Sequence, residues 1–191
     1  MAEPGVVEVE VTTWSLELRR PSELRPSPAP ESELTLLQAK RPSPELSRFL
    51  YTAVGGDWYW IDRLAWSPER WLEWLSRTGV ETWVAYLEGT PAGYFELDGS
   101  SGSEVEIAYF GLLPSFIGKK LGGWLLTRAI ARAWEMGPER VWVHTCSLDG
   151  PNALANYQAR GMRVFKVETN VQELPPEPPG PWPGSRSAVS S

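Results

Sequence analysis

The strongest constraint on the fold is a run of three strand-like segments followed directly by the longest helical segment of the chain. Residues 81–87 and 92–97 are rich in aromatic and β-branched side chains, and Glu-Gly-Thr-Pro between them predicts a tight hairpin. Residues 104–113 form a third predicted strand, and residues 118–135 a long amphipathic helix. This order predicts an antiparallel meander whose last strand runs into a helix.

The rest of the chain adds strands and helices around this meander. Alternation predicts a strand at residues 6–18, and the other expected elements are helices at 44–53, 67–79 and 151–160 and strands at 140–146 and 162–171. We therefore expect one α/β (α+β) domain over residues 1–173, with a mixed, mostly antiparallel sheet flanked by helices. Residues 21–43 are expected to be a proline-rich loop region. Residues 174–191 are expected to be an extended or disordered tail, which Trp182 could tie to the domain.

Composition excludes several classes of function. The net charge of -6 argues against a nucleic-acid partner, because phosphate backbones require a basic face. A single cysteine and a single histidine leave no internal disulfide and no clustered histidine or cysteine metal site, so no metal is expected. No apolar run is long enough to span a bilayer and no leader is evident, so we expect a cytoplasmic protein without a membrane partner. The 11 tryptophans would be compatible with a homodimer.

Three glycines and two lysines stand at the start of the predicted long helix. The leading N–H groups of a helix lack intrahelical partners and favour anions, and glycine lets a ligand approach the backbone. The spacing of Gly118, Gly122 and Gly123 fits neither a nucleotide P-loop nor a dinucleotide fingerprint. An anion-binding cradle and an ordinary loop-to-helix junction both remain open from these residues alone.

In this region the chain resembles the GCN5-related N-acetyltransferase (GNAT) superfamily. Ile-Gly-Lys-Lys-Leu-Gly at residues 117–122 takes the place of the family's Gln/Arg-x-x-Gly-x-Gly/Ala, with Ile117 replacing Gln or Arg and Lys120 replacing the first motif glycine. Residues 152–162 resemble the family's Asn/Ala…Tyr-x-x-x-Gly-Phe segment, with Met162 at the phenylalanine position. The resemblance covers residues 81–167 and implies that the fold is the family's and that acetyl-CoA is the co-substrate.

The resemblance also implies roles for particular residues. Tyr157 matches the tyrosine that protonates the departing thiolate, although a lone tyrosine on a short helix is also an ordinary core residue. Glu106 is the expected base, while Glu104 would face solvent; a polar strand face and catalysis without a dedicated base remain open. The residues expected to hold acetyl-CoA are Leu112, Leu113, Ile117, Gly118, Lys119, Lys120, Gly122, Gly123 and Asn152.

Two further groups of residues admit both a functional and a structural interpretation. Trp58, Tyr59, Trp60 and Asp62 are expected to bind substrate, forming an aromatic, acidic cage for an ammonium group, or else the aromatic rings pack under the sheet. His144 would be a base or, as is commoner for a lone strand histidine, a hydrogen-bonded structural residue. A nucleophilic role for Cys146 is disfavoured, because His144 is its only obvious partner.

We therefore expect an acetyl-CoA-dependent N-acetyltransferase that acts on a primary amine of a small molecule or amino-acid derivative, by direct attack on the thioester. Two alternatives remain at this point. One is a protein N-acetyltransferase. The other is a catalytically degenerate domain that binds CoA or acts through protein contacts, and the departures at Ile117 and Lys120 favour it.

Overall fold

The computed structural model describes residues 5–31 and 33–185, which fold around one seven-stranded sheet. The sheet order is β2-β3-β4-β5-β6-β1-β7, and every neighbouring pair is antiparallel except β5 and β6. This confirms the expected mixed, mostly antiparallel sheet. The strands are β1 (Val7–Leu18), β2 (Leu34–Gln38), β3 (Val80–Leu87), β4 (Thr90–Asp98), β5 (Glu104–Leu112), β6 (Arg140–Cys146) and β7 (Arg163–Leu174).

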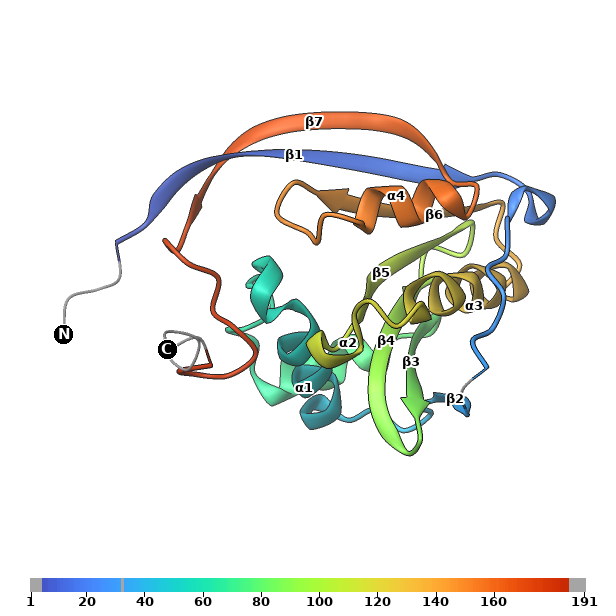
Figure 1. The fold of residues 1–191 in the computed structure, drawn as a ribbon, viewed down its shortest axis with the longest axis horizontal. Coiled ribbons are helices and arrows are strands. Elements are labelled where there is room, and N and C mark those ends of the chain that lie inside the picture. Colours follow the sequence, from blue (N-terminus) through green and yellow to red (C-terminus); the bar gives the residue numbers. More distant parts are fainter. Residues whose placement is uncertain (1–4, 32, 186–191) are drawn as a thin grey trace.

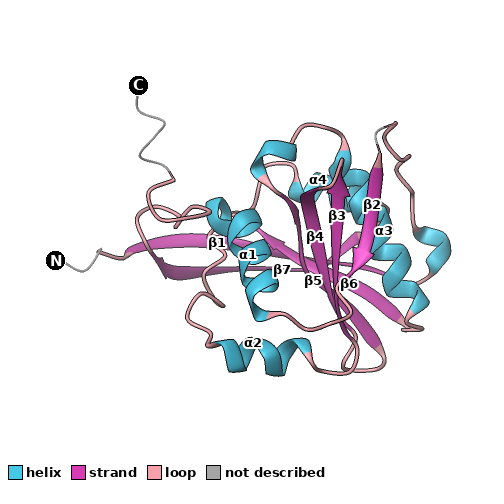
Figure 2. Ribbon diagram, turned by 90° about the horizontal axis from the view of Figure 1, so that it is seen from below, coloured by secondary structure: helices cyan, strands magenta, loops and turns pink. Residues whose placement is uncertain are grey.

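Helices cover both faces of the sheet, as Figures 1 and 2 show. On one face lie α1 (Pro44–Gly55), the short η2 turn (Gly56–Trp58) and α2 (Pro68–Leu75). On the other lie α3 (Leu121–Glu135) and α4 (Ala153–Ala159). Ser43 and Ser67 cap α1 and α2 by accepting hydrogen bonds from the amides of Leu46 and Arg70, which explains where these helices begin.

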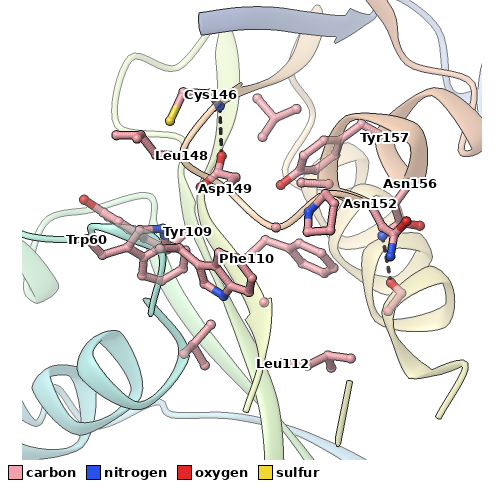
Figure 3. Close-up of a pocket in the computed structure, with 18 of the residues that line it drawn as sticks. Trp60, Tyr109, Phe110, Leu112, Cys146, Leu148, Asp149, Asn152, Asn156 and Tyr157 are labelled. Carbon is pink, nitrogen blue, oxygen red and sulfur yellow. Dashed lines mark hydrogen bonds between the residues drawn. The ribbon is translucent and has the colours of Figure 1, made fainter. Parts of the chain in front are cut away.

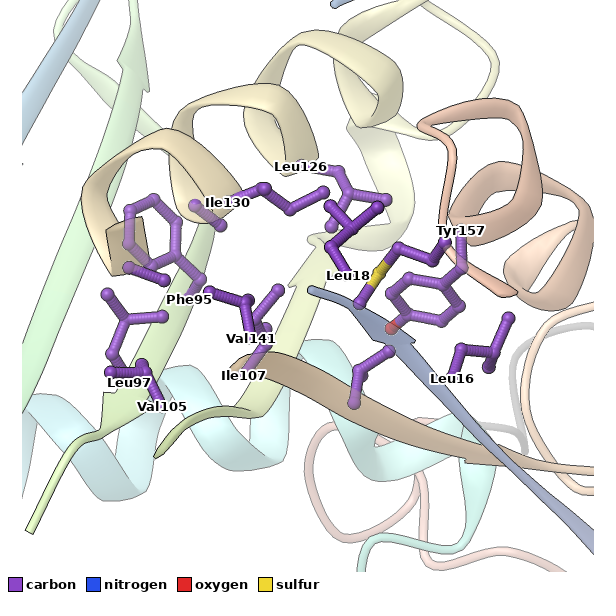
Figure 4. Close-up of a cluster of buried hydrophobic side chains, with 14 of the residues drawn as sticks. Leu16, Leu18, Phe95, Leu97, Val105, Ile107, Leu126, Ile130, Val141 and Tyr157 are labelled. Atoms are coloured by element: carbon purple, nitrogen blue, oxygen red, sulfur yellow. The ribbon is translucent and has the colours of Figure 1, made fainter. Parts of the chain in front are cut away.

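The main hydrophobic core lies between the sheet and the α3/α4 layer. Leu16 and Leu18 of β1 pack there with Phe95 of β4 and with Leu126 and Ile130 of α3 (Figure 4). Smaller clusters join α1 and α2 to the opposite face, through residues such as Leu50, Val54, Trp71 and Tyr94. The tertiary structure is therefore fixed from both faces of the sheet.

The two ends of the chain meet in the sheet. β1 lies between β6 and β7 and is antiparallel to both. The first strand of the sequence therefore pairs with the last one, on the side of β6 that lies away from the meander. The β1–β7 ribbon arches past the end of β6 (Figure 1), because β6 pairs only with Thr13–Leu18 of β1 whereas β7 pairs from Val7 onwards.

Some local expectations are wrong. Residues 21–43 are not wholly loop, because Leu34–Gln38 forms the edge strand β2 beside β3. The long helix begins at Leu121 rather than at residue 118.

The end of the chain is more ordered than expected, over the residues that the structure describes. β7 continues to Leu174, and the amide of Gly180 donates a 2.8 Å hydrogen bond to the carbonyl of Gly56. Trp182 is 65% exposed, so the backbone at Gly180, not the Trp182 ring, ties this segment to the domain. Residues 186–191 of the expected tail lie outside the described residues.

A local irregularity in β5 opens the sheet. Glu96 pairs with Tyr109 and Leu97 with Ile107, which leaves Ala108 as an extra, bulged residue. β5 and β6 pair only from Glu104↔Arg140 to Glu106↔Trp142, although both strands continue beyond this point. Beyond the bulge, the alternation of β5 side chains between the α1/α2 face and the α3/α4 face is reversed. The ends of β5 and β6 that do not pair leave room between these two strands.

Candidate functional site

A cavity of about 1080 Å³ lies where β5 and β6 stop pairing. It is lined by β5 from Ile107 to Leu112, by Val143, His144 and Cys146 of β6, by the turn into α3, by the loop and helix after β6, and by the loop after α1. Figure 3 shows Trp60 and Tyr109 on one wall, with Tyr157, Asn152 and Asn156 on the opposite wall and Phe110 and Leu112 of β5 between them. The cavity therefore connects the two helical layers through the opening in the sheet.

The structure brings most of the residues singled out in the sequence to this cavity. Those that line it are Trp58, Tyr59, Trp60, Asp62, Leu112, Ile117, Gly118, Lys120, Gly122, Gly123, Asn152 and Tyr157. Glu106, Leu113 and Lys119 are not among the lining residues. Leu113 packs with the α1 cluster, and the Lys119 ammonium lies 5.0 Å from the centre of the Phe116 ring. Glu106 is hydrogen-bonded to His144 instead.

The turn into α3 has the backbone geometry of an anion cradle. Gly118 and Lys120 both have left-handed backbone conformations, with φ of +83° and +62°. Lys120 is the N-cap residue and supplies no side-chain cap, so the leading amides of α3 have no side-chain acceptor there. Left-handed residues next to a helix start turn successive amides toward one point, and the helix dipole favours negative charge there.

The glycines behind this turn leave it open. A Cβ atom at Gly122 would meet nothing closer than 3.7 Å, whereas one at Gly123 would lie 2.5 Å from the Arg160 guanidinium. A Cβ at Gly122 would therefore make only ordinary van der Waals contacts, with Asn156 and Leu112 of the cavity lining, and Gly123 allows close packing against Arg160.

Tyr157 of α4 lies on the same wall as the cradle. It is 6% exposed, its ring centre lies 6.0 Å from that of Phe110, and within residues 5–31 and 33–185 its hydroxyl makes no hydrogen bond. Burial raises the pKa of Tyr157 and the Asp149 carboxylate adds to this, so the phenol is fully protonated at neutral pH. Asn156, which the sequence pattern did not single out, donates a 3.4 Å hydrogen bond to the Gly122 carbonyl and links α4 to the cradle.

The opposite wall is aromatic and acidic. The Trp60 ring packs edge-on against Tyr109, with ring centres 4.9 Å apart, and the Tyr109 hydroxyl donates a 2.7 Å hydrogen bond to Asp62. Trp60 also packs against Tyr51, so this ring both lines the cavity and belongs to a packed cluster. Gly55 makes this packing feasible, because a Cβ there would lie 2.0 Å from the Trp60 ring.

A buried ion pair lies behind this wall. Arg63 Nη1 is 2.9 Å from Glu96 Oε1, and both side chains are almost fully buried. The guanidinium carbon lies 4.3 Å from the ring centres of both Trp74 and Tyr109, and the Trp74 indole donates a 2.8 Å hydrogen bond to Glu96. Arg63 thus anchors the end of the loop that carries Trp60 and Asp62.

His144 reaches the cavity from β6. Its Nδ1 lies 3.0 Å from Glu106 Oε1, and this hydrogen bond raises the pKa of His144 above its ordinary value. Cys146 lies on the same strand face, where burial raises the pKa of its thiol and therefore disfavours the reactive thiolate.

No group of three or more His, Cys, Asp or Glu side chains suited to a metal ion occurs in the part of the chain that the structure describes. Among the same residues, none of the helices is long and apolar enough to cross a membrane.

Comparison with solved structures identifies the same fold in N-acetyltransferases. A GCN5-related N-acetyltransferase from Kribbella flavida is 18% identical with a TM-score of 0.63, and the match covers 88% of this chain and 60% of that one. One from Sphaerobacter thermophilus is 22% identical with a TM-score of 0.60, covering 91% of this chain and 54% of that one. This chain therefore spans little more than half the length of these two relatives.

A shorter relative is an aminoglycoside acetyltransferase from an uncultured soil metagenomic sample, solved in complex with trehalose. It is 17% identical with a TM-score of 0.54, over 66% of this chain and 86% of that one. A comparison with curated protein sequences gives no match. At the level of families, residues 47–162 match the acetyltransferase (GNAT) family, and this segment contains the meander, the cradle and α4. The chain belongs to the GNAT acetyltransferase family.

Proposed function

We propose that this chain transfers an acetyl group from acetyl-CoA to a primary amine of a small molecule or amino-acid derivative, which attacks the thioester directly. The observation that carries this proposal is the single cavity with two unlike walls. One wall presents the backbone cradle and Tyr157, and the other presents aromatic rings with the Asp62 carboxylate. A cavity of this kind suits an anionic thioester on one side and a cationic amine on the other.

The residues around the cradle fit acetyl-CoA. The amides near Gly118, Lys120 and Gly122 would hold the pyrophosphate, and Lys120 would add positive charge. The lack of a side chain at Gly122, which lines the cavity, would let the ligand approach the backbone. The apolar side chains of Phe110 and Leu112 would line the pantetheine path along β5. Bound acetyl-CoA supplies a thioester carbonyl that an amine nitrogen can attack. The lysine at position 120 is compatible with this role, because the backbone amide is retained.

Tyr157 would donate the proton that the leaving sulfur needs. Its position on the cofactor wall, its protonated state and its lack of another hydrogen-bond partner among the described residues support this role. The raised pKa makes the phenol a weaker acid and the phenolate a stronger base, so reprotonation of the phenolate after the transfer is favourable.

The acceptor side suits an ammonium group more than a neutral or acidic compound. Trp60, Tyr109 and Asp62 present aromatic rings and a carboxylate to the same space, and cations are attracted by both kinds of group. One of the structural relatives is an aminoglycoside acetyltransferase by name, so an aminoglycoside belongs in a test panel of amines.

A thiol-release assay over a panel of primary amines tests the proposal. The panel includes tryptamine, putrescine, lysine, kanamycin and a peptide with a free amino terminus, so that small-molecule and protein acceptors are compared. We expect release of CoA with at least one small amine and a fall in kcat of about 10²-fold in Tyr157→Phe.

Tyr86→Phe is the matched control, because Tyr86 lies on β3 and does not line the cavity. Acetyl-CoA binding without thiol release for any acceptor would contradict the enzymatic proposal and favour the degenerate CoA-binding domain. Release with the peptide alone would favour the protein N-acetyltransferase.

A further inference from the structure

His144 and Tyr157 reach the cavity from opposite faces of the sheet. On β6, Val141 and Val143 are buried in the core under α3 and α4, so Trp142, His144 and Cys146 point to the other face. That is the face covered by α1 and α2, where Trp60, Tyr109 and Asp62 form the aromatic, acidic wall. Tyr157 belongs to the α4 layer. His144 is therefore on the proposed amine side and Tyr157 on the proposed thiol side.

The hydrogen bond to Glu106 fixes the state of the His144 ring. A carboxylate only accepts hydrogen bonds, so His144 Nδ1 carries the proton in the 3.0 Å contact with Glu106 Oε1. In the neutral ring the lone pair then lies on Nε2. No residue of the described chain forms a hydrogen bond with Nε2, and the His144 side chain is about half exposed and lines the cavity.

We propose that His144 is the general base of the acetyl transfer and that Glu106 is a positioning residue that acts through it; this rests on the function proposed above. An ammonium substrate first loses one proton to solvent, because only the neutral amine has the lone pair that attacks the acetyl carbon. As the bond from the amine nitrogen to the acetyl carbon forms and the bond from that carbon to sulfur breaks, Nε2 of His144 takes the next proton from the nitrogen. Tyr157 delivers a proton to the sulfur, and solvent then accepts the proton of the imidazolium and reprotonates the phenolate. The products are an acetamide and a free thiol, and no oxidant, reductant or metal is required.

This assignment changes the role expected for Glu106. Its carboxylate does not line the cavity, and one of its oxygens is engaged by His144. Glu106 orients the ring, selects the Nδ1–H tautomer and stabilises the imidazolium that forms when Nε2 is protonated. A base oriented by a carboxylate in this way is a common arrangement for proton transfer at neutral pH.

The charged groups that act on the His144 ring are carboxylates. Besides Glu106 on β5, these are Asp62 on the loop after α1 and Asp149 on the loop after β6. On β6 the neighbouring titratable group is the Cys146 thiol, and across β1 the partner is the uncharged Ser15. The hydrogen bond to Glu106 raises the pKa of His144, burial opposes it, and the three carboxylates add to the rise. Removal of Glu106 is therefore expected to lower this pKa.

The chain offers a direct spectroscopic test, because His144 is its only histidine. A pH titration of the imidazole resonances by NMR assigns one pKa and one tautomer without ambiguity. We expect the Nδ1–H tautomer and a pKa above the ordinary value of about 6.5 in the unaltered protein. In Glu106→Gln the pKa should fall, while Glu104→Gln should leave it unchanged. Glu104 is a matched control, since it lies two residues earlier on β5 and pairs with Arg140.

The kinetic test compares pH profiles of kcat/KM for acetyl-CoA and the most active amine of the panel. At pH 7.5, His144→Gln should lower kcat/KM about 10²-fold or more, and Glu106→Gln by a smaller factor. The acidic limb of the profile should move to lower pH in Glu106→Gln by the same amount as the NMR pKa. The pKa of the free amine substrate is the same with every variant, so a difference in the acidic limb between variants reports a protein group and not the substrate.

If His144 were purely structural, Glu106→Gln would still lower the NMR pKa of His144, but the acidic limb of the kcat/KM profile would not move with it. The proposal is overturned if His144→Gln keeps kcat/KM within about twofold of the unaltered protein, if the acidic limb does not follow the NMR pKa, or if the neutral ring carries its proton on Nε2. Failure of the proposed function is a different result, since the unaltered protein would then bind no acetyl-CoA or would release no thiol with any acceptor of the panel.

Discussion

The buried Arg63–Glu96 pair gives a quantitative prediction about how the acceptor wall is held. Neither side chain is more than 7% exposed, and the 2.9 Å contact is enclosed by Trp74 and Tyr109. Although burial acts to lower the pKa of Arg63, the Glu96 carboxylate holds it above its ordinary value. Burial raises the pKa of Glu96, and Arg63 with the Trp74 indole opposes this.

Removing either charge leaves the other buried without its partner. Arg63→Met and Glu96→Gln should each lower the free energy of unfolding by about 3–5 kcal/mol, which is a large part of a typical domain stability of about 5–15 kcal/mol. For a chain of this size, that corresponds to a fall in melting temperature of roughly 10 °C. The double variant should lose less than the sum of the single losses, by about 2 kcal/mol, because neither charge then remains.

Urea unfolding followed by tryptophan fluorescence measures these losses. Lys166→Met and Glu168→Gln are the controls, because this pair has a similar distance of 2.7 Å but side chains that are 54% and 52% exposed. These surface changes should cost no more than about 1 kcal/mol each. If the losses at Arg63 and Glu96 were additive, or if each single loss were as small as in the control pair, the two buried charges would not stabilise each other as inferred here.

Two further predictions concern the walls of the cavity. Lys120 has φ of +62°, a conformation that glycine adopts without strain. Lys120→Gly should therefore be about 1 kcal/mol more stable than Lys120→Ala in urea unfolding. Equal stabilities of the two variants would show that the backbone at residue 120 is not strained. Trp60→Ala should raise KM for the amine and leave the Kd of acetyl-CoA nearly unchanged, as measured by steady-state kinetics and calorimetry. Equal losses of amine and acetyl-CoA binding in Trp60→Ala would assign this ring to packing alone.

The sequence predicts elements with their own local pattern better than elements that depend on distant partners. The strand at residues 140–146 has the same bounds in the structure, because its alternation and its flanking glycine and proline are local features. β2 has only the five residues Leu34–Gln38 beside a proline-rich segment, and it is a strand because β3 pairs with it. The helix start at residue 118 is wrong by three residues, since the left-handed turn at Gly118 and Lys120 precedes the helix.

The same distinction holds for the candidate site. Glycines, lysines and a tyrosine that resemble the GNAT pattern predict, from the sequence, most of the residues that line the proposed cofactor wall. The bulge at Ala108, the early end of β5–β6 pairing and the insertion of β1 beside β6 result from tertiary contacts with no local pattern. The contact between His144 and Glu106 joins residues 38 positions apart, so only the folded chain distinguishes a direct base from a positioning carboxylate.

The proposed function depends on acetyl-CoA binding at the turn into α3, and Gly122 lies at the start of that helix, where a substitution can test this binding. A Cβ at this position would make only ordinary van der Waals contacts with Asn156 and Leu112 in the cavity lining, and replacing a glycine inside a helix favours folding. Gly122→Leu should therefore fold at least as stably as the unaltered chain while its side chain fills the cradle. Glu135→Leu, at the exposed far end of the same helix, is the matched control.

Isothermal titration calorimetry with acetyl-CoA is the decisive measurement, accompanied by thermal unfolding of each variant. The unaltered protein and Glu135→Leu should bind one acetyl-CoA per chain with similar Kd, and Gly122→Leu should lose at least tenfold in affinity without loss of thermal stability. Absence of binding by the unaltered protein, or equal affinity in Gly122→Leu, would contradict the assignment of this turn as the acetyl-CoA site.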